Sequence, residues 1–486
     1  MVNSMIRKSD VKWKFLLPII CLSFGVYFLL KPSGLDLFAW RTAIIFIATI
    51  VCIVLKTLPI GAIGIIAITV YAVTFSGGEP SASASMKSAL SAMNNSLIWL
   101  IVIAFMIARG FIKTGLGQRV ALLLVKIFGK RTLGLAYGLA FADLILAPAM
   151  PSNTARCGGV IYPVADSLAR SFNSLPDDIS RKKIGTYLIS CIGAVNDITS
   201  TLFMTGFTAN LLAVKLAALQ GVTITWLHWF LYFLAPCIIS FMITPVVIYY
   251  LSPPEIKRTP DAPVQASKKL REMGKISSPE WIMIATVITL LVLWIFGQQL
   301  HIDQTATAFI GLSALLLSGV LTWSDVKNEK DAWDTLIWFS ALLMLANKLG
   351  ELGFTSWFGD IIASDVGSSI GGVSWIFILI ALSIIYCYLH YFFASGNAIV
   401  AALYAVFLSV GIKLGVPPLI MALMLSSATN LSCSLTQYTH ARGPILFGAG
   451  YIPTGTWWKN GFTMSVVNLI IFFSVGLAWW KITGLY

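Results

Sequence analysis

The chain has 486 residues, of which 58% are hydrophobic and only 11% charged, and its formal net charge at pH 7 is +13. A soluble domain of average composition has about 25% charged residues, which excludes a string of soluble domains. The basic residues are scattered through short segments and form no face interleaved with aromatic residues, which argues against nucleic-acid binding. We therefore expect an all-α polytopic membrane protein.

The apolar segments predict how the chain crosses the membrane, because a spanning helix needs about 20 mainly apolar residues. Two stretches, 133–168 and 373–410, are interrupted midway by polar and small residues. Each is too long for one helix and too short for two spans, and each predicts a re-entrant helical hairpin. The other stretches predict eleven spans: 15–31, 40–56, 58–75, 97–112, 184–215, 228–251, 281–298, 305–322, 335–349, 417–450 and 460–481.

The N-terminal segment has a basic start, including Arg7 and Lys8, before its apolar run. This arrangement is also found in signal peptides, but no small-residue cleavage site follows, so we interpret the run as a retained first helix. Basic residues then concentrate in segments 113–131, 169–183 and 252–280, whereas 76–96 and 299–304 together hold only Lys87. The positive-inside rule predicts a cytoplasmic N-terminus and an extracellular C-terminus.

The two halves of the chain repeat, on either side of a linker at 252–280. Ser96–Leu100 matches Thr335–Phe339, and Pro151–Ala155 is echoed by Ala394–Ala398 at the other hairpin centre. The predicted topology makes the two copies enter from opposite sides. Inverted repeats with broken helices are typical of secondary transporters.

The first hairpin break offers a site for a carboxylate. Non-helical backbone at membrane depth is tolerated only where it is buried or lines a cavity. Prolines end one helix, and Ser152 or Asn153 is placed to cap the next, whose free N–H groups and dipole favour an anion. Thr154 adds a further donor.

Arg156 follows on the first turn of that helix. An arginine near the bilayer midplane costs at least about 2.5 kcal/mol and marks a candidate functional residue. Its planar guanidinium group suits a carboxylate. The alternative is that Arg156 pairs with a buried acid such as Asp143 or Asp197.

Three further breaks are expected to face the first. The second hairpin turns at Ser395, Gly396 and Asn397. Such residues occur at any bend, so they indicate a site only because they stand at the position that the repeat matches to the first break. The long span 184–215 has a polar middle with Thr205 and Gly206, for which ordinary helix–helix hydrogen bonding is the alternative.

The matching break in 417–450 carries Thr436, Thr439 and His440, followed by Arg442. For His440 and Arg442 the alternative is that they reach the cytoplasmic interface. The remaining histidines are isolated, and no set of residues has catalytic or metal-ligand spacing. We therefore predict a protein that is not an enzyme, with no cofactor and no metal.

Several motifs resemble one known family, the divalent anion:sodium symporters. They are Pro151–Ala155, Phe447–Pro453 and Gly455–Lys459. Segments 122–126, 129–133 and 152–156 are similar to the antiporter branch for di- and tricarboxylates, which includes citrate/succinate and tartrate/succinate antiporters and 2-oxoglutarate/malate translocators. The resemblance covers about residues 35–482.

This resemblance implies a homodimer in which an elevator motion carries substrate between the two hairpin tips. It implies scaffold parts at 1–132 and 281–372 and transport parts at 133–251 and 373–486. Ser152, Asn153 and Thr154 would lie at the substrate site, and the second motif falls on Ser395, Gly396 and Asn397.

Two departures from the sodium-coupled pattern qualify the expected activity. Those members usually repeat Ser-Asn-Thr in the second hairpin, where this chain has Ser-Gly-Asn, and tend to carry Thr at the position of Arg156. A fixed guanidinium group repels sodium and neutralises substrate charge instead. We therefore predict sodium-independent exchange of C4–C6 dicarboxylates (2-oxoglutarate, malate, succinate or fumarate) in a bacterial inner membrane. The alternatives are a sodium-coupled symporter, a cation/proton antiporter or a channel.

Overall fold

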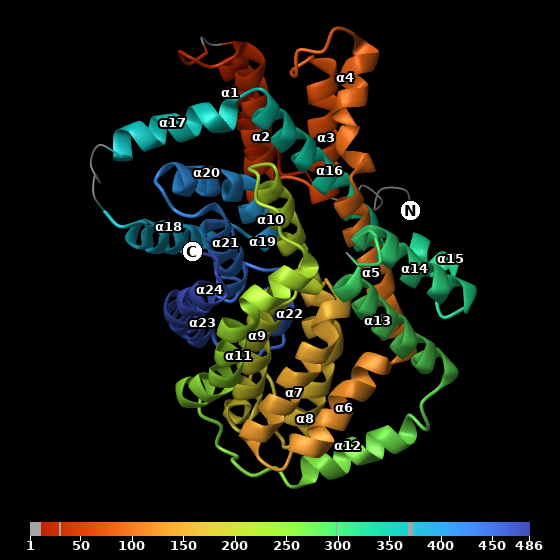
Figure 1. Cartoon of the computed structure of the whole chain (residues 1–486). Coiled ribbons are helices and arrows are strands. Elements are labelled where there is room, and N and C mark those ends of the chain that lie inside the picture. Colours follow the sequence, from red (N-terminus) through yellow and green to blue (C-terminus); the bar gives the residue numbers. More distant parts are fainter. Residues whose placement is uncertain (1–10, 29–30, 298, 368–372) are drawn as a thin grey trace, which may run out of the picture.

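A computed structural model describes residues 11–28, 31–297, 299–367 and 373–486, and within them the chain is helical with no strand (Figure 1). Several sequence predictions lie outside the described residues. They are Arg7 and Lys8, the end of the first expected span at 29–30, residue 298 of another span, and the expected domain boundary at 372.

The helices of the first half are α1 (Trp13–Phe28), α2 (Leu37–Val54), α3 (Ile60–Val73), α4 (Ala82–Ala89), α5 (Ser96–Thr114), α6 (Leu116–Phe128), α7 (Thr132–Leu146), α8 (Tyr162–Ser171), α9 (Gly185–Leu202), α10 (Thr208–Ala218) and α11 (Trp226–Leu251). Those of the second half are α12 (Asp261–Glu272), α13 (Ser278–Phe296), α14 (Gln304–Leu317), α15 (Trp323–Lys327), α16 (Lys330–Glu351), α17 (Phe354–Gly367), α18 (Trp375–Leu389), α19 (Gly396–Ile399), α20 (Ala405–Lys413), α21 (Pro418–Leu431), α22 (Gly443–Gly448), α23 (Thr454–Ile471) and α24 (Leu477–Ile482). Short 3-10 and π segments are η1 (Ser91–Asn94), η2 (Ala147–Ala149), η3 (Ala155–Ile161), η4 (Ile179–Lys182), η5 (Met204–Gly206), η6 (His390–Phe392), η7 (Val400–Tyr404) and η8 (Phe472–Gly476).

Both expected hairpins consist of two helices that break at the predicted polar residues. In the first, α7 ends before the prolines, and η3 with α8 forms the returning arm. In the second, α18 is followed by α19, η7 and α20. A π segment follows the tip in each hairpin, so the repeat extends to this local distortion, which is frequent at functional sites.

The number of membrane crossings stays a prediction. In the described residues, eight helices are long and apolar enough to span, or nine if the bent pair Lys330–Glu351 and Phe354–Ile361 is one span. Three of the eight, Thr132–Ala149, Trp375–Phe392 and Gly396–Lys413, are arms of the expected hairpins, and shorter apolar helices lie in other expected spans. The long spans 184–215 and 417–450 are each divided by a polar break, into α9 and α10 and into α21 and α22.

Helices also occur where connecting segments were expected. The linker 252–280 contains α12, which buries Ala262 and Ala266 and packs against α6 (bottom of Figure 1). Because only one face of α12 is apolar, its sequence has no apolar run. The short helices α4 and α15 and the longer α6 also lie in segments that were expected to connect spans. Their sequences likewise contain no apolar run long enough to predict a span.

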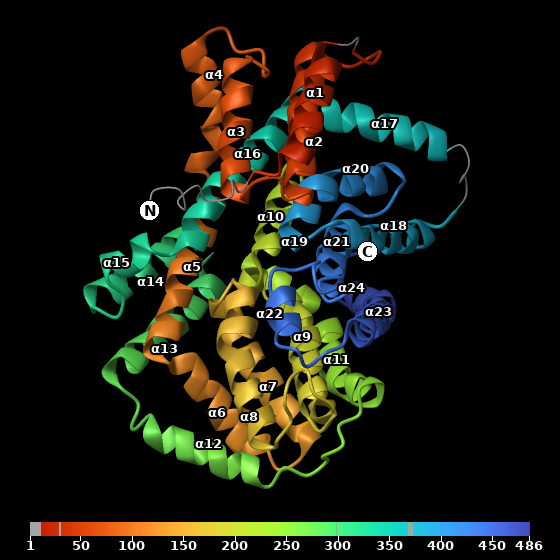
Figure 2. The same ribbon diagram turned by 180° about the vertical axis from the view of Figure 1, so that it is seen from behind.

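The helices form two groups that place the site. The first contains α2, α3, α5, α13, α14 and α16, which contact one another; the second contains both hairpins with α9, α11, α21 and α23. Helices α6 and α17 connect the groups at the ends of α5 and α16 (Figure 1). Gly115 and Gly353 stand at these two junctions with φ of +75° and +79°, where other residues are strained. Viewed from behind, α22 lies beside α9 (Figure 2).

Candidate functional site

The break between α9 and α10 joins the two hairpins. Thr205 donates a hydrogen bond of 2.6 Å to the carbonyl of Pro148 at the first hairpin tip. Thr208 donates one of 2.9 Å to the side-chain oxygen of Asn397 in the second tip. The first three predicted breaks therefore lie together.

The break after α21 completes the group. A ring nitrogen of His390, at the second hairpin, lies 3.1 Å from the carbonyl oxygen of Thr439. The rings of Phe207 and His440 have centroids 5.2 Å apart, which connects this break to the one before α10. Thr439 also bonds within the break, where its hydroxyl donates to the Thr436 carbonyl at 2.9 Å.

The first hairpin tip presents buried donors. Ser152 accepts a 3.1 Å hydrogen bond from the backbone N–H of Ala155 and so caps the returning arm, as predicted. Asn153 is 2% exposed, and its side-chain amide nitrogen has no hydrogen-bond partner among the described residues. Thr154 is half-buried. A buried donor without a partner costs about 1–3 kcal/mol, so a ligand that accepts from Asn153 would recover that energy.

Arg156 is fully buried, and each of its guanidinium nitrogens is used within the protein. Nε donates to Asp143 at 3.1 Å, Nη1 to the carbonyls of Met150 at 2.6 Å and Gly206 at 3.1 Å, and Nη2 to the Ser200 hydroxyl at 2.8 Å. The pairing with Asp143 is thus the interpretation that the structure shows. No part of the guanidinium group is exposed in this conformation.

A second buried arginine lies in the same chain of contacts. Asn196 donates to both carboxylate oxygens of Asp143 at 3.0 Å and accepts from Arg442 at 2.7 Å. Arg442 also pairs with Asp197. We call Arg156, Asp143, Asn196, Arg442 and Asp197 the arginine–aspartate network. Its two cations and two anions cancel, which a buried set of charges requires.

One interpretation at this break needs correction. Arg442 and His440 do not reach an interface, because they are 2% and 3% exposed. Of the two acids named as possible partners for Arg156, Asp143 forms the pair, and Asp197 pairs with Arg442. The backbone break lets Arg442 turn toward α9, and no sequence pattern shows that direction.

The Ser-Gly-Asn sequence of the second tip has a steric cause. A Cβ atom added to Gly396 would lie 2.8 Å from two atoms of the Phe207 ring. The aromatic ring thus fills the space that a side chain would need. This contact explains why the tip has glycine where the first tip has Asn153.

We expect Gly396→Ala to lower the free energy of unfolding by about 1–3 kcal/mol, the usual cost of overpacking. Thermal unfolding of the purified protein in detergent measures this. The double variant Gly396→Ala with Phe207→Leu should regain most of the lost free energy of unfolding. Gly159→Ala is the matched control, because nothing lies within 4 Å of the added atom there. Equal unfolding of the Gly396 and Gly159 variants would contradict the steric account.

A cavity of 470 Å³ adjoins the second tip. Ser395 lines it from the hairpin, and Lys12 and Lys56 line it from the ends of α1 and α2. Both lysines are exposed, and among the described residues no carboxylate lines the cavity. Its volume is in the range of small-molecule sites, and its charge suits an anion.

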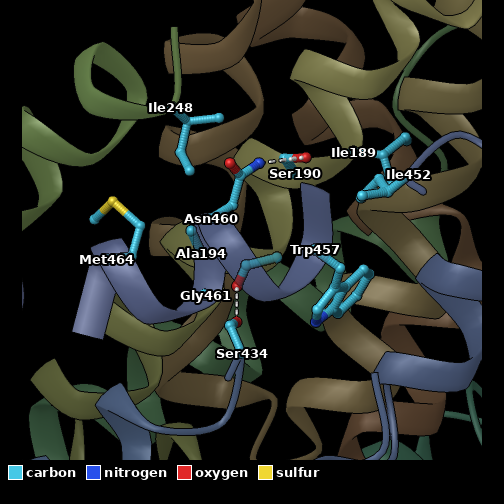
Figure 3. A pocket seen from close by; sticks show the side chains of 11 residues that line it. Ile189, Ser190, Ala194, Ile248, Ser434, Ile452, Trp457, Asn460, Gly461 and Met464 are labelled. Atoms are coloured by element: carbon cyan, nitrogen blue, oxygen red, sulfur yellow. Dashed lines mark hydrogen bonds between the residues drawn. The ribbon is translucent and has the colours of Figure 1, made fainter. Parts of the chain in front are cut away.

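A second cavity lies behind the break that precedes α22, between α9 and α23 (Figure 3). Asn460 donates to Ser190 at 3.3 Å across it. Its volume of 20 Å³ holds about one water molecule, which excludes it as a site for a larger solute.

Sequence reasoning missed Asn196, Asn430 and the role of Asp197. Asn430 on α21 donates to the side-chain oxygen of Asn210 on α10 at 2.7 Å and so links the two halves. The sequence did contain an indication of these residues, because polar residues inside apolar membrane helices are energetically costly and commonly functional.

Known proteins are similar in sequence to this chain over nearly its whole length. The family model for the sodium:sulfate symporter transmembrane region matches residues 9–486. YflS of Bacillus subtilis, described as a candidate malate transporter, is 48% identical over 481 residues, covering 99% of this chain and 98% of that protein. Chloroplast dicarboxylate transporter 2 of Spinacia oleracea is 42% identical, covering 99% and 84%. The L-tartrate/succinate antiporter of Escherichia coli is 35% identical, covering 97% and 99%.

Solved structures share the fold at low identity. The YdaH transporter of Alcanivorax borkumensis superposes with a TM-score of 0.56 at 12% identity, covering 97% of this chain and 98% of that one. MtrF of Neisseria gonorrhoeae gives 0.55 at 13% identity, covering 96% and 93%.

Proposed function

The chain belongs to the divalent anion:sodium symporter family, and we propose that it exchanges C4–C6 dicarboxylates such as 2-oxoglutarate, malate, succinate or fumarate across the membrane without sodium. The names of its relatives support dicarboxylates as the substrate class, and one of those relatives is an antiporter.

The surroundings of Arg156 carry the proposal. Where transporter helices are broken, unwound backbone carbonyls commonly coordinate sodium. Here the carbonyls of Met150 and Gly206 and the hydroxyl of Ser200 accept from the guanidinium group. The guanidinium group, a fixed cation, thus occupies oxygen atoms of the kind that would otherwise coordinate a sodium ion. Such a chain has no need of sodium to balance the charge of the site.

The substrate is held between the two hairpin tips in this proposal. Asn153 and Thr154 supply donors from the first tip, and Ser395 supplies one from the second. The N-terminus of the first returning arm, capped by Ser152, adds its free N–H groups. Four further residues support the two tips and do not contact the dicarboxylate: Thr205, Gly206, Thr436 and His440.

An elevator motion in a homodimer is part of the proposal. The group with both hairpins would move as a transport part against a scaffold built from α2, α3, α5, α13, α14 and α16. The junction glycines Gly115 and Gly353, both in the left-handed region, are suited to act as hinges for α6 and α17. The membrane is the bacterial inner membrane, with a cytoplasmic N-terminus.

We expect Asn153→Ala to lower kcat/KM for exchange by about 10- to 100-fold, because a hydrogen bond to a charged group contributes about 1.5–3 kcal/mol. Asn153→Asp should lower it further, since its carboxylate repels the substrate. Initial rates in proteoliposomes measure both. Asn94→Ala, at an exposed asparagine outside the site, is the control and should behave as wild type. Unchanged kcat/KM in Asn153→Ala would remove this residue from the site.

We expect Lys56→Gln to raise KM about two- to fivefold with little change in kcat. A unit charge about 10 Å from a dianion in water contributes roughly 0.8 kcal/mol by Coulomb's law. The difference from wild type should shrink at high salt, because salt screens exposed charges. Lys87→Gln, outside the cavity, is the control. A salt-independent effect would show that the lysine acts by another route.

Counterflow in proteoliposomes tests the function. Uptake of labelled 2-oxoglutarate should require an unlabelled dicarboxylate inside the vesicles, should saturate, and should be reduced by competing malate, succinate or fumarate. Uptake into empty vesicles that needs a sodium gradient would identify a symporter instead. Flux that neither saturates nor responds to internal substrate would identify a channel.

A further inference from the structure

Two arginines are held opposite each other at the basic end of the molecule. Arg131, before α7, and Arg258, in the linker after α11, form an isolated antiparallel bridge. The backbone N–H of Thr132 donates to the carbonyl of Lys257 at 3.2 Å, which fixes the two segments side by side.

This arrangement gathers positive charge without neutralising it. Arg131, Lys257 and Arg258 are all exposed, and none forms an ion pair with a carboxylate in the described part of the chain. Like charges placed directly opposite in such a pair are destabilising. An anion between the side chains would remove the repulsion.

A cavity of 380 Å³ lies at this bridge. Its lining comes from three segments and comprises Arg131, Leu133, Val246, Tyr249, Tyr250, Lys257 and Arg258. Arginine and lysine are the usual partners of phosphate groups, and tyrosines are enriched at membrane–water interfaces.

An apolar stripe leads from the cavity along α11. Its members are spaced as one face of a helix and remain exposed in the molecule: Ile239, Met242, Ile243 and Tyr250. Val246, part of the cavity lining, continues the same face. An acyl chain that lay on this stripe would bring its head group to the arginines.

We propose that this cavity binds the head group of an anionic phospholipid, with one acyl chain along α11. Basic pockets between membrane helices on the positively charged side are suited to such head groups. The paired arginines and Lys257 contact the phosphate, and the tyrosines lie at the glycerol level. The site is separate from the substrate site and does not depend on the proposed exchange activity.

Native mass spectrometry of the detergent-purified full chain tests this, with phosphatidylglycerol and phosphatidylcholine as probes. We expect wild type to prefer phosphatidylglycerol. The variant with Arg131→Gln, Lys257→Gln and Arg258→Gln should lose at least about tenfold of that preference, since each basic residue near an anionic surface strengthens attraction about fivefold. The matched control, Lys268→Gln with Lys275→Gln and Arg271→Gln, removes the same charge from exposed positions of the linker outside the cavity and should keep the preference.

Equal loss in both triple variants would overturn the proposal, because it would show general charge attraction. Displacement of phosphatidylglycerol by equimolar inorganic phosphate would also overturn it, because the site would then hold a free anion. If the triple variant does not fold, Arg258→Gln alone should lower the preference about fivefold, and wild-type preference in that variant would count against a lipid site.

Discussion

Arg156→Met should abolish exchange, with a loss of at least about a hundredfold in rate, and should also destabilise the protein. Removing one member of a buried ion pair leaves the other charge uncompensated and costs about 3–5 kcal/mol. Asp143 is the charge left behind, and the carbonyls of Met150 and Gly206 lose their donor. Exchange in proteoliposomes and thermal unfolding in detergent measure the two effects.

A double variant separates stability from function. Arg156→Met combined with Asp143→Asn leaves no unpaired charge and should recover most of the lost stability while exchange stays lost. Arg170→Met is the matched control, because Arg170 pairs with Asp166 at the surface and its loss should change neither quantity. Recovery of wild-type exchange in the double variant would show that the fixed cation is structural only.

Arg442→Met should have an effect of similar size for a different reason. Arg442 belongs to the second half of the chain but bonds to Asn196 and Asp197 on α9 of the first. Its removal leaves Asp197 buried without its partner and loosens the contact between the two halves of the site. We expect a loss of about 3–5 kcal/mol in stability and at least a tenfold fall in kcat/KM for the protein that remains folded.

Arg119→Met provides the comparison for Arg442→Met. Arg119 forms a buried pair with Glu280 at 2.5 Å, outside the site. Its loss should destabilise the protein to a similar extent, but the folded fraction should keep the wild-type kcat/KM. If the two variants have the same kcat/KM, Arg442 does not shape the substrate site.

The positions of the breaks were predictable because they follow local rules. Prolines and small polar residues interrupt the apolar run at Ser152, small polar residues alone interrupt the one at Ser395, and the repeat between the halves indicates that these breaks belong together. Capping by Ser152 follows from the same chemistry. The structure confirms both hairpins as pairs of helices with breaks at these residues.

The partners of the charged residues were not predictable in the same way. Arg442 and Asp197 are 245 positions apart, and no local pattern connects them. Arg156 had two acids available, and only the fold selects Asp143. The contact of Phe207 with Gly396 likewise depends on how α10 and the second hairpin meet. Helix α12 was missed because a helix with one apolar face lacks the long apolar run that predicts a span.

Sodium replacement tests the central claim most directly. In proteoliposomes loaded with malate, uptake of labelled 2-oxoglutarate is measured with sodium on both sides and again with choline in its place. If the guanidinium group of Arg156 supplies the charge that sodium would bring, the two rates are equal. A fall of tenfold or more on removing sodium would contradict the account and identify a sodium-coupled transporter.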